Sequence, residues 1–301
     1  MAELEQRPLG ASGVSVSVVG LGCNNLGRRI DKARAREVVD AALDAGVTFF
    51  DTARSYGDGD SERFLGQILE GRRDRAVVAT KFAGYREESY GLRKGSREYV
   101  RRAAQESLER LRTDYLDVLY VHDPDNLDGP LTETWSYLLE LVDEGLVRAP
   151  GISNVSAERL RRLDGVAVVQ NEYSLLNRAA EAEILPLCME RGIGFVPYFP
   201  LASGLLTGKY RRGEPAPEGS RLAGHELPDH WDELERLEQL ARERRTSLLE
   251  LAVGALASHP AVASVIAGAT RPEQVRANAA AGAFRLSPEE YASLWDAARS
   301  S

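Results

Sequence analysis

The chain has 301 residues, of which 43% are hydrophobic and 28% charged, and its formal net charge is −8. These values are typical of a globular protein with a sizeable core. The negative charge argues against nucleic acid as a partner, because that binding depends on clustered cations. No stretch approaches the roughly 18 apolar residues of a membrane span, and the N-terminus lacks the features of a signal peptide. We therefore expect a cytoplasmic protein without a membrane partner.

Cysteine usage agrees with that compartment. The two cysteines, Cys23 and Cys188, lie far apart in the sequence, with one in each half. This usage favours free thiols in a reducing environment over a structural disulfide.

Apolar stretches alternate with amphipathic segments along most of the chain. Residues 7–19 predict a small β-hairpin that turns at Ser12 and Gly13. After the hairpin, eight apolar strand candidates are each followed by a segment rich in arginine and glutamate. The expected strands are 18–22, 47–50, 76–80, 116–121, 147–152, 167–170, 193–197 and 262–266. The expected helices are 31–45, 61–70, 97–111, 131–143, 156–163, 179–191, 232–257 and 272–281.

Strict alternation of strand and helix predicts a parallel sheet. Eight such units in about 280 residues fit a closed (β/α)₈ TIM barrel better than an open sheet. The main rival, a doubly wound sheet, usually carries a glycine-rich dinucleotide fingerprint, and residues 20–25 lack its third glycine. We expect one barrel domain over residues 1–301, with the hairpin before it and an extra C-terminal helix that begins at Ser287 and Pro288.

Two features interrupt the regular pattern. Residues 199–231 form a long segment rich in glycine and proline, and loops of this length in compact domains are usually functional. Pro150 falls inside the fifth predicted strand and cannot donate a backbone hydrogen bond. We expect it to shorten that strand or to cause a bulge.

Polar residues follow three of the predicted strands at their carboxyl ends. Asp51 and Tyr56 come after the second strand, Lys81 ends the third and His122 ends the fourth. In a parallel barrel, neighbouring strands bring such residues to one patch of the rim where chemistry collects. Each residue alone is more often structural, as a packed tyrosine, a paired charge or a hydrogen-bonded histidine. Together the four form a coherent candidate site.

This set suits the acid-catalysed reduction of a carbonyl group. The pKa of tyrosine in solution is near 10, too high for efficient proton donation at neutral pH. A neighbouring ammonium favours the phenolate, so Lys81 is expected to lower the pKa of Tyr56, and Asp51 to hold Lys81 by a salt bridge. A neutral His122 can donate a hydrogen bond to the carbonyl oxygen. Such a site needs a hydride donor and no metal ion.

The candidate residues belong to a longer pattern of motifs. The stretch GVTFFDTA at 46–53, followed by Tyr56 and Gly57, resembles the signature of the aldo-keto reductase family. The similarity covers about residues 7–297 in order, which makes it far more specific than a single motif. Its other segments are Lys81, 120–125 (YVHDPD), 151–154 (GISN), 170–174 (QNEYS), 198–210 and 268–278.

The resemblance implies a TIM barrel that binds a nicotinamide dinucleotide without a Rossmann domain. Asp51, Tyr56, Lys81 and His122 correspond to the family's catalytic tetrad, in which Tyr56 is the general acid in reduction and the base in oxidation. The cofactor contacts implied by the resemblance are Gly22, Cys23, Asn24, Asp51, Ser153, Asn154, Gln170, Tyr198, Phe199, Pro200, Leu201, Ala202, Ser203, Gly204, Lys209, Arg221, Gly268, Thr270, Gln274 and Asn278.

The resemblance favours NADP(H), with NAD(H) as the alternative. Some relatives hold the 2′-phosphate of NADP with Lys at the position of Gly268 and Arg at that of Gln274. Here Thr270, Gln274 and Arg271 are expected to do so. Phe199 stands where many relatives have Ser, so a side-chain contact to phosphate is lost at that position.

The expected activity is oxidoreduction of an aldehyde, ketone or sugar carbonyl, or of the corresponding alcohol, by a monomer or small homo-oligomer. Two readings stay open beside it, an NAD-dependent aldose dehydrogenase and a cofactor-binding regulatory subunit with little turnover. Residues 200–221 resemble potassium-channel β subunits, but those subunits carry Asn where this chain has His122, which favours turnover. The substrate is expected to contact Tyr56, His122, Phe82 and Tyr85.

Overall fold

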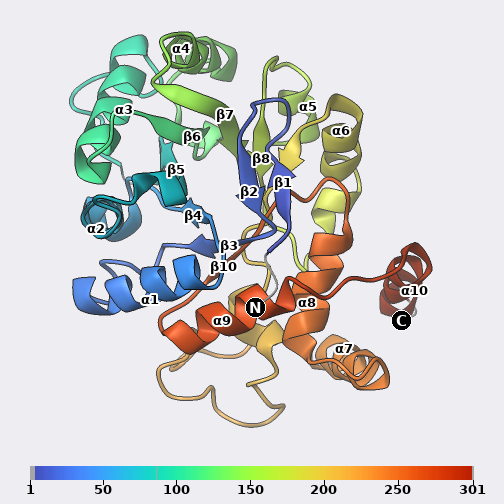
Figure 1. Cartoon of the computed structure of the whole chain (residues 1–301). Coiled ribbons are helices and arrows are strands. Elements are labelled where there is room, and N and C mark those ends of the chain that lie inside the picture. The colour runs from blue at the N-terminus through green and yellow to red at the C-terminus, as the bar shows by residue number, and fades with distance from the viewer. Residues whose placement is uncertain (1–3, 86, 300–301) are drawn as a thin grey trace.

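The fold is an eight-stranded parallel barrel surrounded by helices, as predicted (Figure 1). A computed structural model describes residues 4–85 and 87–299. The strands pair in the order β10-β3-β4-β5-β6-β7-β8-β9. Their bounds are β3 Val19–Gly22, β4 Phe49–Asp51, β5 Val77–Phe82, β6 Leu116–Val121, β7 Val147–Ser153, β8 Val168–Gln170, β9 Gly194–Phe195 and β10 Val265–Gly268.

The barrel closes between β9 and the segment that leads into β10. The backbone N–H of Phe195 donates to the Ala261 carbonyl at 2.8 Å, and the Phe195 carbonyl accepts from the N–H of Ala263 at 2.8 Å. Because residues 261–263 make this contact before β10 begins, the last strand starts three residues later than the sequence predicts.

The predicted helices surround the strands. The bounds at 97–111, 131–143 and 272–281 are confirmed. The helices of the ring are α1 Lys32–Asp44, α2 Asp60–Ile68, α3 Arg97–Leu111, α4 Leu131–Asp143, α5 Ala157–Leu160, α6 Ile184–Arg191, α7 Trp231–Glu243, α8 Leu248–Ser258 and α9 Pro272–Ala281.

The segment expected to be helical over 232–257 is divided into two helices, because the chain breaks between α7 and α8. Arg245 adopts the left-handed conformation with φ of 55°, which ends the first helix. Ser247 then caps α8 in a reciprocal capping box with Glu250. The serine and glutamate are spaced as such a box requires, so the sequence carried the signal for a second helix start.

Pro150 does not interrupt the fifth barrel strand, contrary to our expectation. β7 runs from Val147 to Ser153, and its register with β6 is constant from Leu116↔Val147 to Val121↔Ile152. The Pro150 carbonyl accepts from Ala167 on the β8 side. In a strand, the nitrogen and the carbonyl of one residue point to the same side, so the Pro150 nitrogen also points toward the β8 side. The part of the chain that it meets there comes before the first residue of β8. No ladder hydrogen bond is lost there.

The hairpin closes one end of the barrel. β1 Gln6–Pro8 and β2 Ser15–Ser17 pair antiparallel, and they lie across the strands in Figure 1. Leu9, Val14 and Val16 of the hairpin are buried in one cluster with residues of the barrel interior, such as Val118 and Ile266. The amino-terminal end is thereby filled, and the carboxyl ends of the strands remain available for a site.

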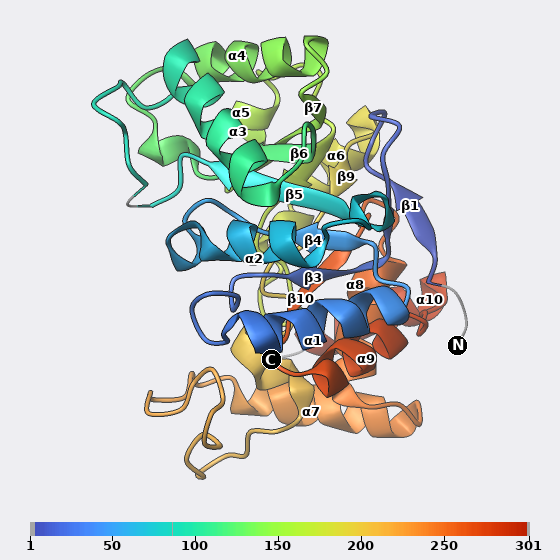
Figure 2. The same cartoon turned by 60° about the vertical axis from the view of Figure 1, so that its left-hand side comes forward.

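The region after β9 contains the longest connection in the described part of the chain. A short 3₁₀ helix, η5 Ala202–Thr207, is followed by irregular chain up to α7, and this loop projects beyond the barrel near α7 in Figure 2.

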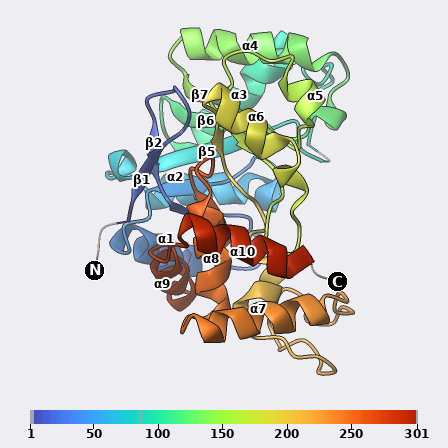
Figure 3. The ribbon, with the colours of Figure 1, turned by 90° about the vertical axis from the view of Figure 1, so that its right-hand side faces the viewer.

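Helix α10 Pro288–Arg299 crosses the outside of the barrel beside α8 in Figure 3, where Leu294 packs with Leu251. Both cysteines are free and buried. No helix in the described residues combines the length and apolar character needed to cross a bilayer.

Gly66 on α2 is expected to be indispensable for packing. A Cβ at this position would lie 2.4 Å from the Arg110 carbonyl oxygen and 2.8 Å from the Leu111 Cα on α3. Gly to Ala inside a helix is normally stabilising, but here backbone must move. We expect Gly66→Ala to lower the free energy of unfolding by about 1–3 kcal/mol in denaturant titration. Gln67→Ala on the same helix serves as the control and should change it by less than about 0.5 kcal/mol.

Candidate active site

A buried ion pair forms the floor of the site. Asp51 ends β4 and Lys81 lies on the adjacent β5, and the Lys81 side chain has no exposed surface. Its Nζ donates to Asp51 Oδ2 at 2.6 Å and to the Thr52 carbonyl at 2.8 Å. Gln170 of β8 donates from Nε2 to the other Asp51 oxygen at 2.8 Å. Burial alone lowers the pKa of Lys81, but Asp51 and Tyr56 raise it by more, so the ammonium stays charged.

Tyr56 lies directly above this pair. It opens the 3₁₀ turn η1 Tyr56–Gly59 that follows β4, and Lys81 Nζ is 5.1 Å from the centre of its ring. Burial raises the pKa of Tyr56, the Lys81 charge lowers it, and the Asp51 charge raises it again. The net shift is upward, so the expected net lowering is wrong for this structure. Loss of hydration around the phenolate outweighs the attraction of the ammonium.

His122 completes the cluster from the end of β6. Its backbone N–H donates to the Phe82 carbonyl at 2.8 Å, which continues the pairing with β5 by one residue. Its ring meets the Tyr56 ring edge-on, with centres 6.1 Å apart. Burial and the nearby Lys81 charge lower the pKa of His122 to about 3. The imidazole is therefore neutral at physiological pH, as expected from the sequence, and it can donate only one hydrogen bond.

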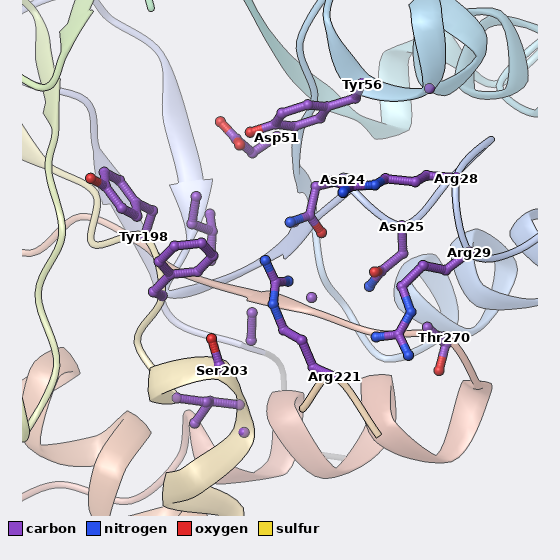
Figure 4. A pocket seen from close by; sticks show the side chains of 18 of the residues that line it. Asn24, Asn25, Arg28, Arg29, Asp51, Tyr56, Tyr198, Ser203, Arg221 and Thr270 are labelled. Carbon is purple, nitrogen blue, oxygen red and sulfur yellow. The ribbon is translucent and has the colours of Figure 1, made fainter. Parts of the chain in front are cut away.

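These residues open into a pocket of about 1140 Å³ at the carboxyl ends of the strands (Figure 4). A volume of this size exceeds the usual range for small ligands and can accept an extended molecule. The predicted residues that line it are Gly22, Asn24, Asp51, Tyr56, His122, Ser153, Asn154, Gln170, Tyr198, Phe199, Pro200, Leu201, Ser203, Gly204, Lys209, Arg221, Gly268, Thr270 and Gln274.

The structure does not bring every predicted residue to the pocket. Phe82 is fully buried against the Tyr99 ring, so it serves the wall of the barrel. Tyr85, the other expected substrate contact, is 71% exposed. The remaining residues outside the lining are Cys23, Ala202, Asn278 and Lys81, the last of which lies beneath the floor.

The polar residues expected to hold a nicotinamide carboxamide are connected to one another. Ser153 Oγ donates to the Gln170 carbonyl at 2.7 Å. Asn154 Nδ2 donates to the His122 carbonyl at 2.9 Å, and Asn154 Oδ1 accepts from the Tyr198 hydroxyl at 2.8 Å. This chain of contacts links β6, β7 and β8 to the loop that carries Tyr198. It fixes the side of the pocket that faces Tyr56.

A second group of predicted residues lies on the loop after β9. Phe199, Ala202 and Ser203 all have positive φ, between 45° and 58°, which is uncommon for residues with side chains. A right-handed residue followed by a left-handed one, as at Leu201 (φ −103°) and Ala202, turns backbone N–H groups to one side and makes an anion-binding concavity. Arg221 covers the Phe199 ring with its guanidinium 4.9 Å from the ring centre. Phe199 therefore holds the Arg221 guanidinium by a cation–π contact, although it lacks the hydroxyl of the serine expected in many relatives.

Arginines that the sequence reasoning did not assign also reach the pocket. Arg28 and Arg29 follow β3 and extend into it from one side, and Arg221 enters from the loop below them in Figure 4. Burial and the charges of Arg29 and Arg28 lower the pKa of Arg221. Within the described residues, Arg28, Arg29, Lys209 and Arg221 form no ion pair with a carboxylate. The signal was the adjacent pair of arginines just past the carboxyl end of the first strand.

The buried pair of Asp51 and Lys81 makes a prediction about stability. Lys81→Met removes the cation and leaves Asp51 charged in a dry site, so we expect a loss of about 3–5 kcal/mol in the free energy of unfolding. The double variant with Asp51→Asn should recover part of that loss, because no uncompensated charge remains. Denaturant titration of both singles and the double gives the coupling. The exposed Lys32→Met is the control, and an equal loss there would contradict the prediction.

Comparisons with known proteins agree with this geometry. The chain is 37% identical to a rice protein named "Probable voltage-gated potassium channel subunit beta", over 91% of this chain and 90% of that protein. The solved holo form of aldo-keto reductase AKR11C1 from Bacillus halodurans is 35% identical, with a TM-score of 0.83 and coverage of 99% and 98% of the two chains.

An aldo/keto reductase from Klebsiella pneumoniae, solved in complex with NADP and acetate, is 32% identical with a TM-score of 0.76, covering 97% of this chain and 94% of that one. The profile of the aldo/keto reductase family matches residues 18–299. With the barrel and the site at its carboxyl rim, these matches show that the chain belongs to the aldo/keto reductase family of oxidoreductases.

Proposed function

We propose that this chain is an NADP(H)-dependent oxidoreductase that reduces an aldehyde, ketone or sugar carbonyl, or oxidises the corresponding alcohol, within one domain. The observation that carries the proposal is the cluster of Tyr56 and His122 above the buried pair of Lys81 and Asp51, at the bottom of the large pocket. A proton donor, a neutral hydrogen-bond donor and a buried cation lie close together there. Carbonyl reduction requires such groups to protonate the carbonyl oxygen and to stabilise the charge that develops.

Tyr56 is the proton donor in this proposal. In its resting state the hydroxyl keeps its proton, since burial raises its pKa. When negative charge develops on the carbonyl oxygen, the hydroxyl proton moves to that oxygen and a phenolate forms beside Lys81. The ammonium attracts the phenolate more strongly than the neutral hydroxyl. This interaction therefore strengthens as the proton leaves and lowers the free energy of the transition state. In the reverse direction the phenolate accepts the proton of the alcohol.

His122 orients the substrate. It is neutral, and its ring lies edge-on to Tyr56 in the pocket lining. A single N–H from such a ring can hold the carbonyl oxygen close to the Tyr56 hydroxyl without competing as an acid. Lys81 and Asp51 lie beneath the lining, so they act on the proton donor and leave the substrate to Tyr56 and His122.

The remainder of the pocket fits a nicotinamide dinucleotide. Cations kept free of carboxylates around a cavity suit the phosphates of such a molecule, and Arg28, Arg29, Lys209 and Arg221 form such a set in the described residues. In the loop beside them, the N–H groups of Ala202 and Gly204 donate to the Phe199 and Leu201 carbonyls, so the contacts to an anion are assigned to the N–H groups of Leu201 and Ser203. When bound, the dinucleotide supplies or takes up the hydride. Solved complexes of Klebsiella pneumoniae aldo-keto reductases, one with NADP and one with NADPH, support the same assignment.

The adenosine end favours NADP over NAD in this proposal. Gln274 Oε1 accepts from the backbone N–H of Thr270 at 2.8 Å and from its hydroxyl at 3.2 Å. Gln274 thus holds Thr270 in place, and Arg271 beside it lines the pocket without an ion pair in the described residues. Arg271 supplies the charge that a 2′-phosphate needs. If Arg271 does not contact the 2′-phosphate, the alternative function is that of an NAD-dependent aldose dehydrogenase.

A regulatory role is the second candidate, favoured by the similarity to the rice protein and to a like-named Arabidopsis protein at 36% identity. Such a role needs cofactor binding but little turnover. The presence of His122, where the resemblance implies Asn in channel β subunits, weighs against it. Measured turnover of carbonyl substrates separates the two functions.

Tyr56→Phe is the direct test of turnover. The variant keeps the ring and removes the proton, so we expect kcat for carbonyl reduction to fall by roughly 10² or more while NADPH binding is unchanged. Activity is followed by NADPH consumption with a panel of aldehydes and keto sugars. If the wild type is no faster than the variant on every substrate, the regulatory function is favoured.

Cofactor choice is tested by fluorescence titration with NADPH and NADH in parallel. We expect NADPH to bind at least about tenfold more tightly, the equivalent of one charge-assisted contact. Arg271→Ala should remove most of this preference, and Arg221→Ala should weaken both cofactors. Arg36→Ala, an exposed arginine of α1 outside the pocket, is the matched control. Failure of both cofactors to bind would refute the proposed function.

A further inference from the structure

Two buried polar atoms face each other behind the site without a hydrogen bond. Nδ1 of His122 and Oε1 of Glu87 are both buried and lack a partner. Each lies 2.7 Å from the point where a Cβ of Gly84 would sit, so they can be no farther apart than twice that distance. Ser55 Oγ lies 3.1 Å from the same point. Only a residue without a side chain at position 84 leaves room for these groups to approach.

Glu87 is held in this position by its other oxygen. Its side chain is only 4% exposed, and its Oε2 accepts from Arg54 Nη1 at 3.1 Å and from the Tyr99 hydroxyl at 3.4 Å. The oxygen that faces His122 is therefore the one left over. A buried polar atom without a partner is costly, and the imidazole nitrogen is a second such atom beside the same point.

The charges around Glu87 favour a carboxyl group that keeps its proton. Arg54 is shared between Glu87 and Glu106, with Nη2 of Arg54 3.1 Å from Glu106 Oε2. Arg110 in turn bonds to Glu106 and to the buried Glu62. Two guanidiniums thus serve three carboxyl groups in this buried cluster, and the exposed Arg102 reaches only Glu106, at 3.4 Å. Apart from the exposed Arg102, the cluster thus has one carboxyl group more than it has guanidinium groups, and a buried carboxylate without its own cation is costly.

The ionisation of both partners agrees with this count. Burial raises the pKa of Glu87, and Glu62 raises it further, whereas Arg54 and the backbone amides of Gly84 and Ala83 lower it; the net direction is upward. His122 is neutral, since burial and Lys81 lower its pKa. A neutral imidazole carries one hydrogen, and an ionised carboxylate facing a bare Nδ1 would repel it. One hydrogen between the two groups removes that conflict.

We propose that Glu87 is a positioning residue, which in its protonated form donates a hydrogen bond to Nδ1 of His122, directly or through one bound water. The single ring hydrogen is then fixed on Nε2, the nitrogen that is not enclosed behind the site. His122 thereby presents a donor to the substrate oxygen instead of a lone pair. The rate effect rests on the proposed carbonyl reduction, whereas the tautomer can be measured without any substrate.

The arrangement of Arg54 makes Glu87→Gln a decisive variant. Arg54 needs an oxygen from residue 87, so the amide oxygen must stay with the guanidinium and the NH₂ group must face Nδ1. The glutamine is therefore a fixed donor. If Glu87 donates, Glu87→Gln keeps the Nε2–H tautomer and changes kcat by less than about threefold. If Glu87 were an ionised acceptor, the same variant would reverse the tautomer and lower kcat.

Glu87→Met removes the donor while keeping a side chain of similar length. We expect the His122 tautomers to become mixed and kcat to fall by about tenfold or more, on the scale of lost outer partners of functional histidines. Binding of NADPH should be unchanged. Glu109→Gln is the matched control, because it removes an exposed carboxylate of α3 that belongs neither to this cluster nor to the surroundings of His122. It should leave both the tautomer and kcat as in the wild type.

The tautomer is read by ¹⁵N NMR of the full chain labelled at its four histidines, with and without NADPH, and with His122→Asn to assign the signals. A reversed tautomer in Glu87→Gln, an unchanged tautomer in Glu87→Met, or an equal loss of kcat in Glu109→Gln would each overturn the proposal. If no carbonyl is reduced by the wild type, the proposed function fails, and the NMR comparison still decides the role of Glu87.

Discussion

The buried ion pair between Lys81 and Asp51 is the constraint on which the site depends. An ammonium without exposed surface is tolerable only with a close carboxylate and satisfied hydrogens, and Asp51 Oδ2 and the Thr52 carbonyl provide both. The pairing of β4 with β5 brings the two charges together at the carboxyl rim. Gln170 then ties Asp51 to β8 across the barrel. The position of the charge pair is thus a consequence of the pairing of β4 with β5.

The barrel itself could be predicted because its signals are local. Alternating apolar and amphipathic segments give the elements, and strict alternation implies parallel pairing. The position of each strand end then gives Asp51, Lys81 and His122 a common rim before any distance is known. The expectations that failed needed information of another kind. Pro150 is harmless because of the side to which its nitrogen points, and that depends on where the neighbouring strand begins.

The direction of the pKa shift could be predicted from the sequence for His122 but not for Tyr56. Both the loss of solvent and the charge of Lys81 lower the pKa of the imidazole, so the direction is certain once the residues are near each other. For Tyr56 the same two causes oppose each other, and their balance depends on how closely the phenol is enclosed. The sequence indicates which charged residues lie near Tyr56, but it does not indicate how deeply the phenol is buried. Arg28 and Arg29 were not assigned for a related reason: their position after the first barrel strand was visible in the sequence, but their freedom from carboxylate partners among the described residues depends on three-dimensional proximity.

The upward shift of the Tyr56 pKa is consistent with a role as proton donor. A tyrosine whose pKa fell to neutrality in the resting site would be partly ionised before the substrate arrived, and it would then have no proton to give. A phenol that stays protonated, beside an ammonium that is already paired and buried, releases its proton only when negative charge develops on the substrate oxygen. Lys81 cannot reorient toward that charge, because Asp51 and the Thr52 carbonyl hold its Nζ in place. In the proposed mechanism its field is therefore already oriented toward Tyr56 when the phenolate forms, and fixed charges of this kind stabilise a transition state without a cost of reorganisation.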